Sequence, residues 1–357
     1  MSDREVDALR LKVQLQSLGL RAPGGLSARK GGAGPADGIT LLIGDLVATV
    51  PTKAWYTARS PYEIRGGAGD EWSLLRDGEH ITEIRVSGDP LFYGRVTSDG
   101  VAYDRIALRH GRDAIGSTVA QGCAHGQDAC KFCAVSASAM AGATVATKEP
   151  GQIAEVAAAA EAEGYTHVVL TTGSTGEDAG MEHLTACAGE VKARTGMRVH
   201  VQYEPPTDPG LIDLVASVSD SAAVNIECFD EHVLEKVAPG KAATGIERFE
   251  QCWERSVASY GRGQVTSFII LGLGESRQSV VEGTRLLTSL GVFPFILPLR
   301  PLSGTPLESW SPPALDVTMD TFEAAAELVL EAGLSASDCL AGCVRCGACT
   351  AFTDITG

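Results

Sequence analysis

The chain has 357 residues, with 29 lysines and arginines against 45 aspartates and glutamates, a formal net charge of −16 and a sequence pI near 4.9. This length allows one large domain or two of ordinary size, each with its own hydrophobic core. The strong acidity argues against nucleic-acid phosphates and anionic membrane surfaces as partners.

The first third of the chain predicts a helix followed by short antiparallel strands. Residues 1–22 carry charges scattered among apolar positions, which indicates an exposed amphipathic helix and not a signal peptide. Short alternating runs then follow, bounded by Gly, Asp and Pro, as is typical of strands. The clearest of these runs are residues 40–43, 46–50, 81–86 and 101–108. We therefore expect an N-terminal helix plus a small β-rich domain over residues 1–110.

From Gly111 the pattern changes to strand, loop and helix, repeated. The predicted strands are residues 115–120, 166–172, 198–204, 222–229, 265–271 and 293–299. The predicted helices are residues 150–164, 181–195, 208–217, 247–260, 276–290 and 317–332. About six βα units in succession predict an α/β fold with a parallel sheet, open or closed into a partial or full barrel, over residues 111–334. The most apolar late run, residues 292–299, is too short and proline-broken to span a bilayer, so we expect a cytoplasmic protein.

Polar side chains on one face of two predicted strands favour a barrel over a doubly wound sheet. His200, Gln202 and Glu204 share one face of the third strand, and Asn225 and Glu227 share one face of the fourth. A doubly wound sheet buries both faces and would carry apolar residues on each. The pattern indicates a lumen that serves as a site, with chemistry at the C-terminal ends of the strands. In the alternative, neighbours satisfy these polar groups inside a packed core.

Three cysteines lie close together directly after the first strand of this array, at Cys123, Cys130 and Cys133. Three thiols within eleven residues, in a chain that we expect to be cytoplasmic, indicate a metal or an iron–sulfur cluster and not a disulfide. A structural zinc or an electron-transfer cluster usually has four protein ligands. Three ligands therefore leave one metal position open for a small molecule. The alternative is three unrelated buried cysteines.

A second cysteine cluster occupies the C-terminal tail, residues 335–357. It contains Cys339, Cys343, Cys346 and Cys349, at spacings of three, two and two intervening residues. We predict an auxiliary [4Fe–4S] cluster here, because the segment resembles ferredoxin-type loops, with a structural zinc as the alternative. If only the last three cysteines bind, the fourth iron would face the substrate.

Glycine-rich loops follow three of the predicted strands, and Phe132 precedes the last cysteine of the first cluster. The loops are Thr171–Asp178, Leu271–Glu275 and Leu302–Leu307. With the cysteine loop, they make the chain resemble the radical S-adenosylmethionine (radical SAM) superfamily from about Ser117 to Leu307, nearest to its biotin synthase-like branch. Asn225–Asp230 and Val237–Lys241 also look like that branch. The cysteine-rich tail further resembles uncharacterised radical SAM proteins of nitrilase-containing bacterial biosynthetic clusters.

The resemblance implies a set of cofactor ligands. Cys123, Cys130 and Cys133 would bind three irons of a [4Fe–4S] cluster whose fourth iron binds S-adenosylmethionine. It also implies contacts to S-adenosylmethionine. Phe132, Gly272 and Gly274 would lie by the adenine, and Thr172, Gly173 and Ser174 would receive the methionyl amino group. Asn225 or Glu227 would face the ribose or the substrate, and Arg248 would bind a carboxylate. The family's usual cysteine spacing is three then two intervening residues, whereas this chain has six then two. The three extra residues leave the role of His125, which we interpret as a loop residue, open.

The implied function is reductive cleavage of S-adenosylmethionine and removal of a hydrogen atom from a small-molecule substrate. We expect Glu204, Glu227 and Arg300 to be the catalytic residues facing that substrate. A low-potential reductant such as flavodoxin or ferredoxin would be a partner, with no nucleic acid and no membrane. The auxiliary cluster would relay an electron, anchor substrate or donate sulfur. The alternative is a non-enzymatic iron–sulfur electron carrier or a zinc-stabilised binding protein, which explains the tail but not the open three-cysteine site.

Overall fold

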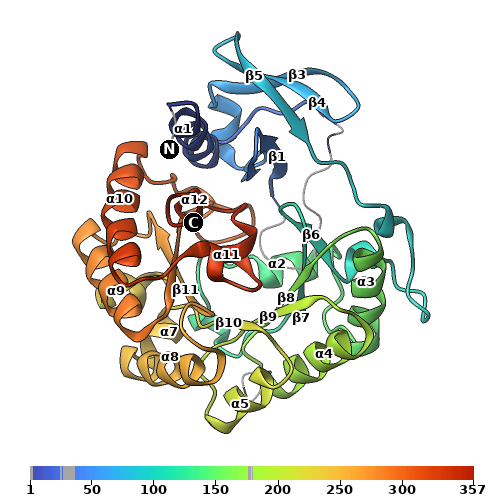
Figure 1. The fold of residues 1–357 in the computed structure, drawn as a ribbon, viewed down its shortest axis with the longest axis vertical. Helices are drawn as coiled ribbons and strands as arrows, with labels where there is room; N and C mark the ends of the chain where they lie inside the picture. Colours follow the sequence, from blue (N-terminus) through green and yellow to red (C-terminus); the bar gives the residue numbers. More distant parts are fainter. Residues whose placement is uncertain (1–2, 25, 27–36, 176–177, 179) are drawn as a thin grey trace.

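The computed structural model describes residues 3–24, 26, 37–175, 178 and 180–357, and this part of the chain contains two β-sheets (Figure 1). Within the predicted loop Thr171–Asp178, residues 176 and 177 lie outside this description. The larger sheet has seven strands and the smaller has five.

The larger sheet is curled into an open half-barrel. Its strands, in spatial order from one end, are β12 (Phe293–Pro298), β11 (Val265–Leu271), β10 (Ser221–Ala223), β9 (Arg198–Gln202), β8 (His167–Thr172), β7 (Ala114–Ala120) and β6 (Leu108–His110). β7 to β12 are parallel, and β6 pairs antiparallel with β7. Successive parallel strands are neighbours, so each helical crossover adds the next strand at the same growing edge. The predicted succession of βα units in a partial barrel is confirmed.

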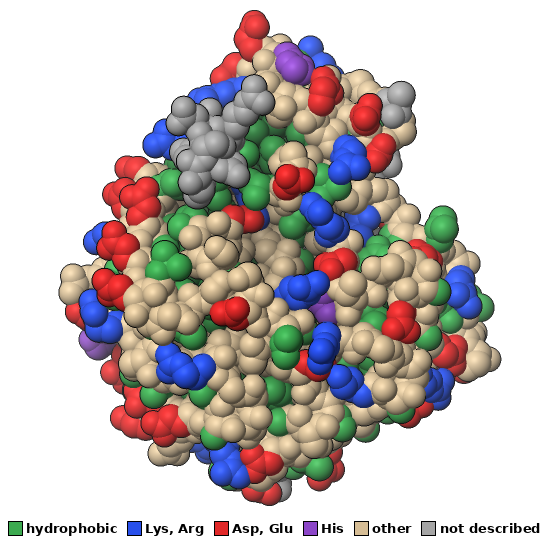
Figure 2. Space-filling model, in the orientation of Figure 1, with side chains coloured by type: hydrophobic (Ala, Val, Ile, Leu, Met, Phe, Trp, Pro, Cys, Tyr) green, Lys and Arg blue, Asp and Glu red, His purple; other side chains and the backbone are tan. Residues whose placement is uncertain are grey.

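Helices cover the outside of the half-barrel (Figure 1). They are α3 (Pro150–Ala162), α4 (Met181–Arg194), α5 (Gly210–Ala216), α8 (Ile246–Tyr260), α9 (Arg277–Leu290) and α10 (Leu315–Glu331). In α8 the buried residues Phe249, Cys252, Trp253 and Ser256 recur at the three- and four-residue spacing of one helix face. Among the described helices, none is both long and apolar enough to cross a membrane. Acidic and basic side chains are interspersed over the face seen in Figure 2, as is typical of a surface in water.

The smaller sheet is antiparallel and forms a β-rich unit with helix α1 (Asp3–Leu18). Its strands are β1 (Ile39–Ile43), β2 (Leu46–Val50), β3 (Tyr62–Ala68), β4 (Glu71–Arg76) and β5 (Glu79–Val86), in the spatial order β2-β1-β5-β4-β3. Buried side chains of α1 and this sheet form a hydrophobic core separate from that of the half-barrel. The β-rich N-terminal sheet is therefore confirmed.

Two of the predicted strands are wrong in detail. Residues 101–108 contain the short 3₁₀ helix Tyr103–Arg105, because Tyr103 and Ile106 bury their side chains at a three-residue spacing. The fourth parallel strand, expected at 222–229, ends at Ala223. Beyond it the ladder is interrupted, because Oδ1 of Asn225 accepts a hydrogen bond from the Phe268 amide at 3.1 Å, and backbone pairing with β11 resumes at Glu227.

The C-terminal tail fills the floor of the half-barrel. Its short helices α11 (Cys343–Cys346) and α12 (Phe352–Ile355) lie at the centre of the ring of outer helices (Figure 1). The Ser221 hydroxyl, at the start of β10, donates to the Ala341 carbonyl at 3.2 Å. A Cβ atom at Gly342 would lie 2.4 Å from the ring of His200 in mid-β9, so only glycine allows this approach. The tail therefore enters from the amino-terminal side of the sheet.

The N-terminal unit holds this tail in place. The ammonium of Lys12, which is fully buried, donates to the Gly347 carbonyl at 2.9 Å and to Asp354 at 2.5 Å. Gln16 donates to the Ala348 carbonyl at 3.0 Å, and the Thr49 amide donates to the same oxygen at 2.7 Å. Residues about 335 positions apart in the chain are thus hydrogen-bonded. The N-terminal unit supports the loop that carries the tail cysteines.

Lys148 makes the stability of the fold depend on pH. Its side chain is fully buried, donates to the carbonyls of Thr118 and Val145 at 2.6 and 3.0 Å, and burial lowers its pKa to about 7. The unfolded chain therefore binds more protons than the folded one between pH 7 and pH 10.5, and stability rises with pH across that window.

We expect a Lys148→Met variant to lose this dependence. Its stability relative to the wild type should fall by on the order of 2 kcal/mol between pH 6 and pH 9, because the wild type alone gains from deprotonation. Urea unfolding at the two pH values measures the difference. If the variant and the wild type differ in free energy of unfolding by the same amount at both pH values, Lys148 remains charged in the folded state.

Candidate active site

A cavity of 320 Å³ occupies the lumen of the half-barrel. Apolar and hydroxyl side chains from the strands line its wall, namely Thr118, Val169, Thr171, Phe268, Ile270, Phe295 and Leu297. Phe132 and Cys133 of the cysteine loop border it, and so do Cys343 and Cys349 of the tail. The two cysteine clusters, more than 200 residues apart in the sequence, therefore meet at one cavity.

The cysteine loop is fastened to the neighbouring strand ends. The Ala124 amide donates to the Ser174 carbonyl at 2.5 Å, and the Lys131 amide donates to the Val237 carbonyl at 2.8 Å. A Cβ atom on Gly173 would lie 1.6 Å from the Gly122 carbonyl oxygen, so the loops can touch only through glycine. Gly173 therefore packs against the cysteine loop, in addition to its predicted contact with the cofactor.

None of the ten cysteines, all of which the structure describes, forms a disulfide, and Cys123, Cys130 and Cys133 are exposed or half-buried. Among the described residues, no group of three or more His, Cys, Asp or Glu side chains is arranged around a single metal ion. Thiolates are the ligands of iron–sulfur clusters, in which each cysteine binds a different iron. Three thiols on one loop beside the lumen fit a [4Fe–4S] cluster in their donor chemistry.

A buried ion pair lies in the cavity wall. Nζ of Lys241 donates to Glu227 at 2.9 Å and to the Asn225 carbonyl at 2.5 Å. Lys241 and Glu227 are only 5% and 7% exposed. Burial alone would lower the pKa of Lys241, but the negative charge of Glu227, with further contributions from Cys130 and Glu204, raises it above its usual range. Lys241 is therefore a fixed positive charge next to the cysteine loop.

Glu227 adopts a left-handed backbone conformation, with φ at +74°. Strand β11 holds it there, because the Glu227 amide donates to the Phe268 carbonyl at 2.9 Å and its carbonyl accepts from the Ile270 amide at 2.8 Å. Such strain in a non-glycine residue is concentrated at functional sites. Oε2 of Glu227 is buried and has no hydrogen-bond partner among the described residues. This oxygen is free to accept a hydrogen bond from a bound molecule.

Glu204 also lines the cavity, beyond the end of β9. Its Oε2 lies 2.7 Å from Nε2 of His125, whose ring packs against Gly240. Burial raises the pKa of Glu204, but Lys241, His125 and Ser174 together lower it below its usual value. The longer cysteine loop thus reaches an ionised carboxylate of the lumen through His125, a contact that the sequence does not reveal.

Arg300 joins the cavity to the tail. Its Nη2 donates to the Thr49 and Cys349 carbonyls at 2.8 and 3.0 Å, and its Nε is buried with no partner among the described residues. Of the other predicted residues, Phe132, Thr172 and Asn225 line the same cavity. The structure therefore brings together Glu204, Glu227 and Arg300 with much of the predicted cofactor set.

Several predicted cofactor residues do not border this cavity. Arg248 donates to the Pro206 carbonyl at 2.8 Å instead. Gly272 packs against Pro313, and Gly274 lines a separate groove that Lys131 of the cysteine loop also borders. Gly173 and Ser174 contact the cysteine loop, as described above. Their roles toward S-adenosylmethionine remain predictions.

Two residues near the site have roles that sequence reasoning missed. Lys241 follows Pro239, which begins the short helix α7 (Pro239–Thr244), and this turn directs it into the lumen. A proline one position inside a helix start is a readable signal for that turn. Glu275 closes the Gly-Leu-Gly-Glu loop and accepts hydrogen bonds from the Phe229 and Asp230 amides at 2.8 and 3.1 Å. It therefore fixes the segment that follows Glu227.

A half-barrel with three cysteines at the carboxyl end of its first parallel strand is typical of enzymes that use an iron–sulfur cluster with an open position. Residues 117–287 match the family model of the radical SAM superfamily, so the chain contains a radical SAM domain. A curated relative, bacteriochlorophyllide c C-7(1)-hydroxylase from Chlorobaculum limnaeum, is 31% identical over 118 residues. The match covers 32% of this chain and 29% of the relative, so the chain spans less than a third of that protein's length.

Two solved structures are similar to this chain. Methylornithine synthase shares 15% identity with a TM-score of 0.44, over 62% of this chain and 69% of that one. A radical SAM methyltransferase from Sphaerobacter thermophilus shares 17% identity with a TM-score of 0.45, over 77% of this chain and 75% of that one. The biotin synthase-like branch and the nitrilase-associated proteins named above remain resemblances.

Proposed function

We propose that this protein cleaves S-adenosylmethionine reductively and uses the resulting radical to remove a hydrogen atom from a small molecule held in the half-barrel lumen. The observation that carries the proposal is the single cavity bordered by Cys133, the Glu227–Lys241 pair and the tail cysteines. Its volume of 320 Å³ lies at the low end for small-molecule sites. The radical SAM domain supports the chemistry.

Cys123, Cys130 and Cys133 would hold the [4Fe–4S] cluster. When bound and reduced, it would supply one electron to the sulfonium, so that the C5′–S bond breaks into methionine and a 5′-deoxyadenosyl radical, which becomes 5′-deoxyadenosine by taking a hydrogen atom from the substrate. A low-potential reductant such as flavodoxin or ferredoxin would provide the electron. Ten cysteines without a disulfide suit a reducing compartment such as the cytoplasm.

The residues of the lumen would bind and orient the reacting molecules. The unpaired Oε2 of Glu227 accepts a hydrogen bond, and the unpaired Nε of Arg300 donates one. These opposite charges in one cavity favour a polar substrate that has both a donor and an anionic group. The apolar wall around Phe268 and Phe295 would exclude water from the radical.

Formation of 5′-deoxyadenosine tests this proposal. The reconstituted protein, given dithionite and S-adenosylmethionine under anaerobic conditions, should form 5′-deoxyadenosine and methionine, measured by chromatography and mass spectrometry. Cys130→Ala should abolish the product, because it removes an iron ligand. Cys252→Ala is the matched control, since Cys252 is buried in α8 and does not border the cavity, and it should retain activity.

The competing function is an iron–sulfur electron carrier or a zinc-stabilised binding protein. A wild-type protein with a full cluster that forms no 5′-deoxyadenosine would favour it and overturn the enzyme proposal. Metal analysis separates the tail alternatives: about eight irons per chain indicate two [4Fe–4S] clusters, whereas about four irons with one zinc indicate a structural tail.

A further inference from the structure

The four tail cysteines are not equivalent in the fold. Cys343 and Cys349 border the lumen cavity. Cys346 lies against the loop before β7, where a Cβ atom on Gly111 would come 2.5 Å from its Sγ. Cys343, Cys346 and Cys349 thus sit around one tight turn, closed by Gly347 in a left-handed conformation with φ at +62°.

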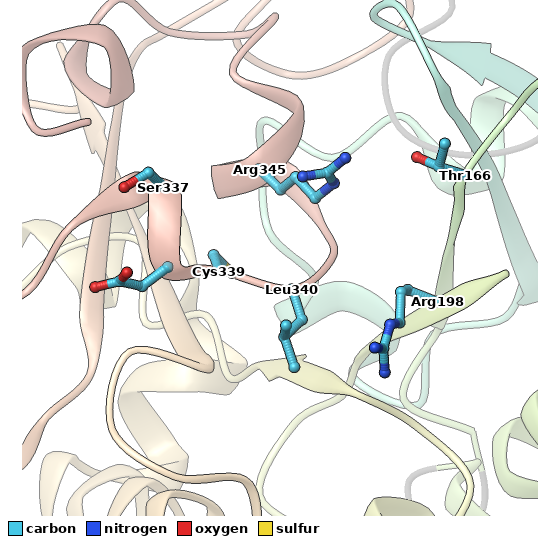
Figure 3. Close-up of a pocket in the computed structure, with 7 residues that line it drawn as sticks. Thr166, Arg198, Ser337, Cys339, Leu340 and Arg345 are labelled. Carbon is cyan, nitrogen blue, oxygen red and sulfur yellow. The ribbon is translucent and has the colours of Figure 1, made fainter.

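Cys339 stands apart from this turn. Its side chain is 2% exposed, packs within the main hydrophobic core, and donates from Sγ to the Ala341 carbonyl at 3.2 Å. It borders a different groove of 260 Å³, which Thr166, Arg198 and Arg345 also line on the amino-terminal side of the sheet (Figure 3). Cys339 therefore has a structural environment of its own, and the lumen cavity does not include it.

The turn that carries the other three cysteines is held by hydrogen bonds to its backbone carbonyls. Lys12 and Gln16 donate to the carbonyls of Gly347 and Ala348, and Arg300 donates to the carbonyl of Cys349. Lys12 is paired with Asp354 at 2.5 Å, whereas Arg300 adds a positive charge beside Cys349 that would stabilise a metal-ligating thiolate. The Lys12 and Gln16 contacts come from α1, whereas Arg300 follows β12 and itself borders the lumen cavity.

We propose that Cys343, Cys346 and Cys349 alone hold the auxiliary [4Fe–4S] cluster, and that its fourth iron faces the lumen and binds the substrate directly. This inference rests on the proposed function. Two of the three ligands border the cavity and the third lies against the loop at Gly111, so a cluster held by this turn would adjoin the lumen. Arg300, between Cys349 and the cavity, would bind an anionic group of the same substrate.

The ligand class follows from this geometry. A substrate that binds both the iron and Arg300 carries a nitrogen, oxygen or sulfur donor close to an anionic group. Amino acids and short hydroxy acids have this chemistry, and they are of a size that a cavity of 320 Å³ admits. The substrate would then be held on the floor of the lumen, opposite the cysteine loop.

The test uses the full chain with the cysteine loop disabled by Cys123→Ala, Cys130→Ala and Cys133→Ala, so that iron reports on the tail alone. After anaerobic reconstitution with iron and sulfide, this protein should bind about four irons. Adding Cys339→Ser should leave the iron content unchanged. Adding Cys343→Ser, Cys346→Ser or Cys349→Ser should reduce it at least severalfold. Loss of iron in a Cys339→Ser protein with unchanged circular dichroism would overturn the proposal, as would zinc in place of iron.

A second measurement does not depend on these tail variants. The loop-disabled protein with all tail cysteines intact is reduced and mixed with ¹³C-labelled cyanide, and electron–nuclear double resonance records the ¹³C coupling. A coupling to the cluster shows an iron without a protein ligand, whereas its absence overturns the proposal. Because no S-adenosylmethionine is present, this result does not depend on whether the wild-type protein forms 5′-deoxyadenosine.

Discussion

Replacing Lys241 by methionine should lower the free energy of unfolding by about 3–5 kcal/mol, because it leaves the buried Glu227 carboxylate without its cation. Glu204 would also lose the nearby positive charge that keeps it ionised. In the same variant, 5′-deoxyadenosine formation should fall at least tenfold, since the negative charges beside the cysteine loop would no longer be balanced. Denaturant unfolding and product analysis measure the two effects.

The double variant Lys241→Met with Glu227→Gln separates stability from activity. Removing both charges should recover much of the lost stability, because an unpaired charge is no longer buried. Activity should stay low if Glu227 contacts the reacting molecules. Full recovery of 5′-deoxyadenosine formation in the double variant would show that the pair serves the fold alone.

Gly173→Ala should have a comparably large effect on activity. The new methyl group would lie 1.6 Å from the Gly122 carbonyl oxygen, so the cysteine loop and the loop after β8 must separate. A misplacement of about 1 Å at a reacting centre can reduce the rate by about a hundredfold. We therefore expect a loss of at least that size, together with a fall in iron content.

Gly151→Ala provides the control for this substitution. Gly151 lies near the start of α3, and a Cβ atom there would meet only one Arg194 nitrogen at 3.9 Å. Alanine in a helix is favoured over glycine, so iron content and activity should be unchanged. Normal iron content in Gly173→Ala would contradict the role of this glycine in seating the cysteine loop.

The sequence predicts well those features that depend on local periodicity. The βα succession follows from apolar runs alternating with amphipathic helices, and the polar alternation of Gln202 and Glu204 indicates the lumen side of β9. The cysteine spacings mark both clusters because their residues are close in sequence. These patterns are sufficient to identify the fold class and several of the residues that border the cavity.

The features that the sequence does not predict depend on contacts between distant segments. Glu227 borders the cavity through a left-handed backbone held by β11, and not through continued strand alternation. Lys241 becomes its partner only when the two short helices after β10 fold back. The position of the tail inside the lumen depends on His200, Ser221 and Lys12, which are 120 or more residues from their tail contacts. Periodicity carries no information about such pairings.

The position of the tail also has a consequence for the order of biosynthesis. A ribosome releases the N-terminal unit and the strands before residues 335–357, so the lumen has no floor while most of the barrel folds. Its closure requires contacts between Lys12 and the Gly347–Asp354 segment, which are 335 to 342 residues apart in the chain and therefore slow to form. The tail therefore closes the chamber only after the strands that form its wall have been synthesised.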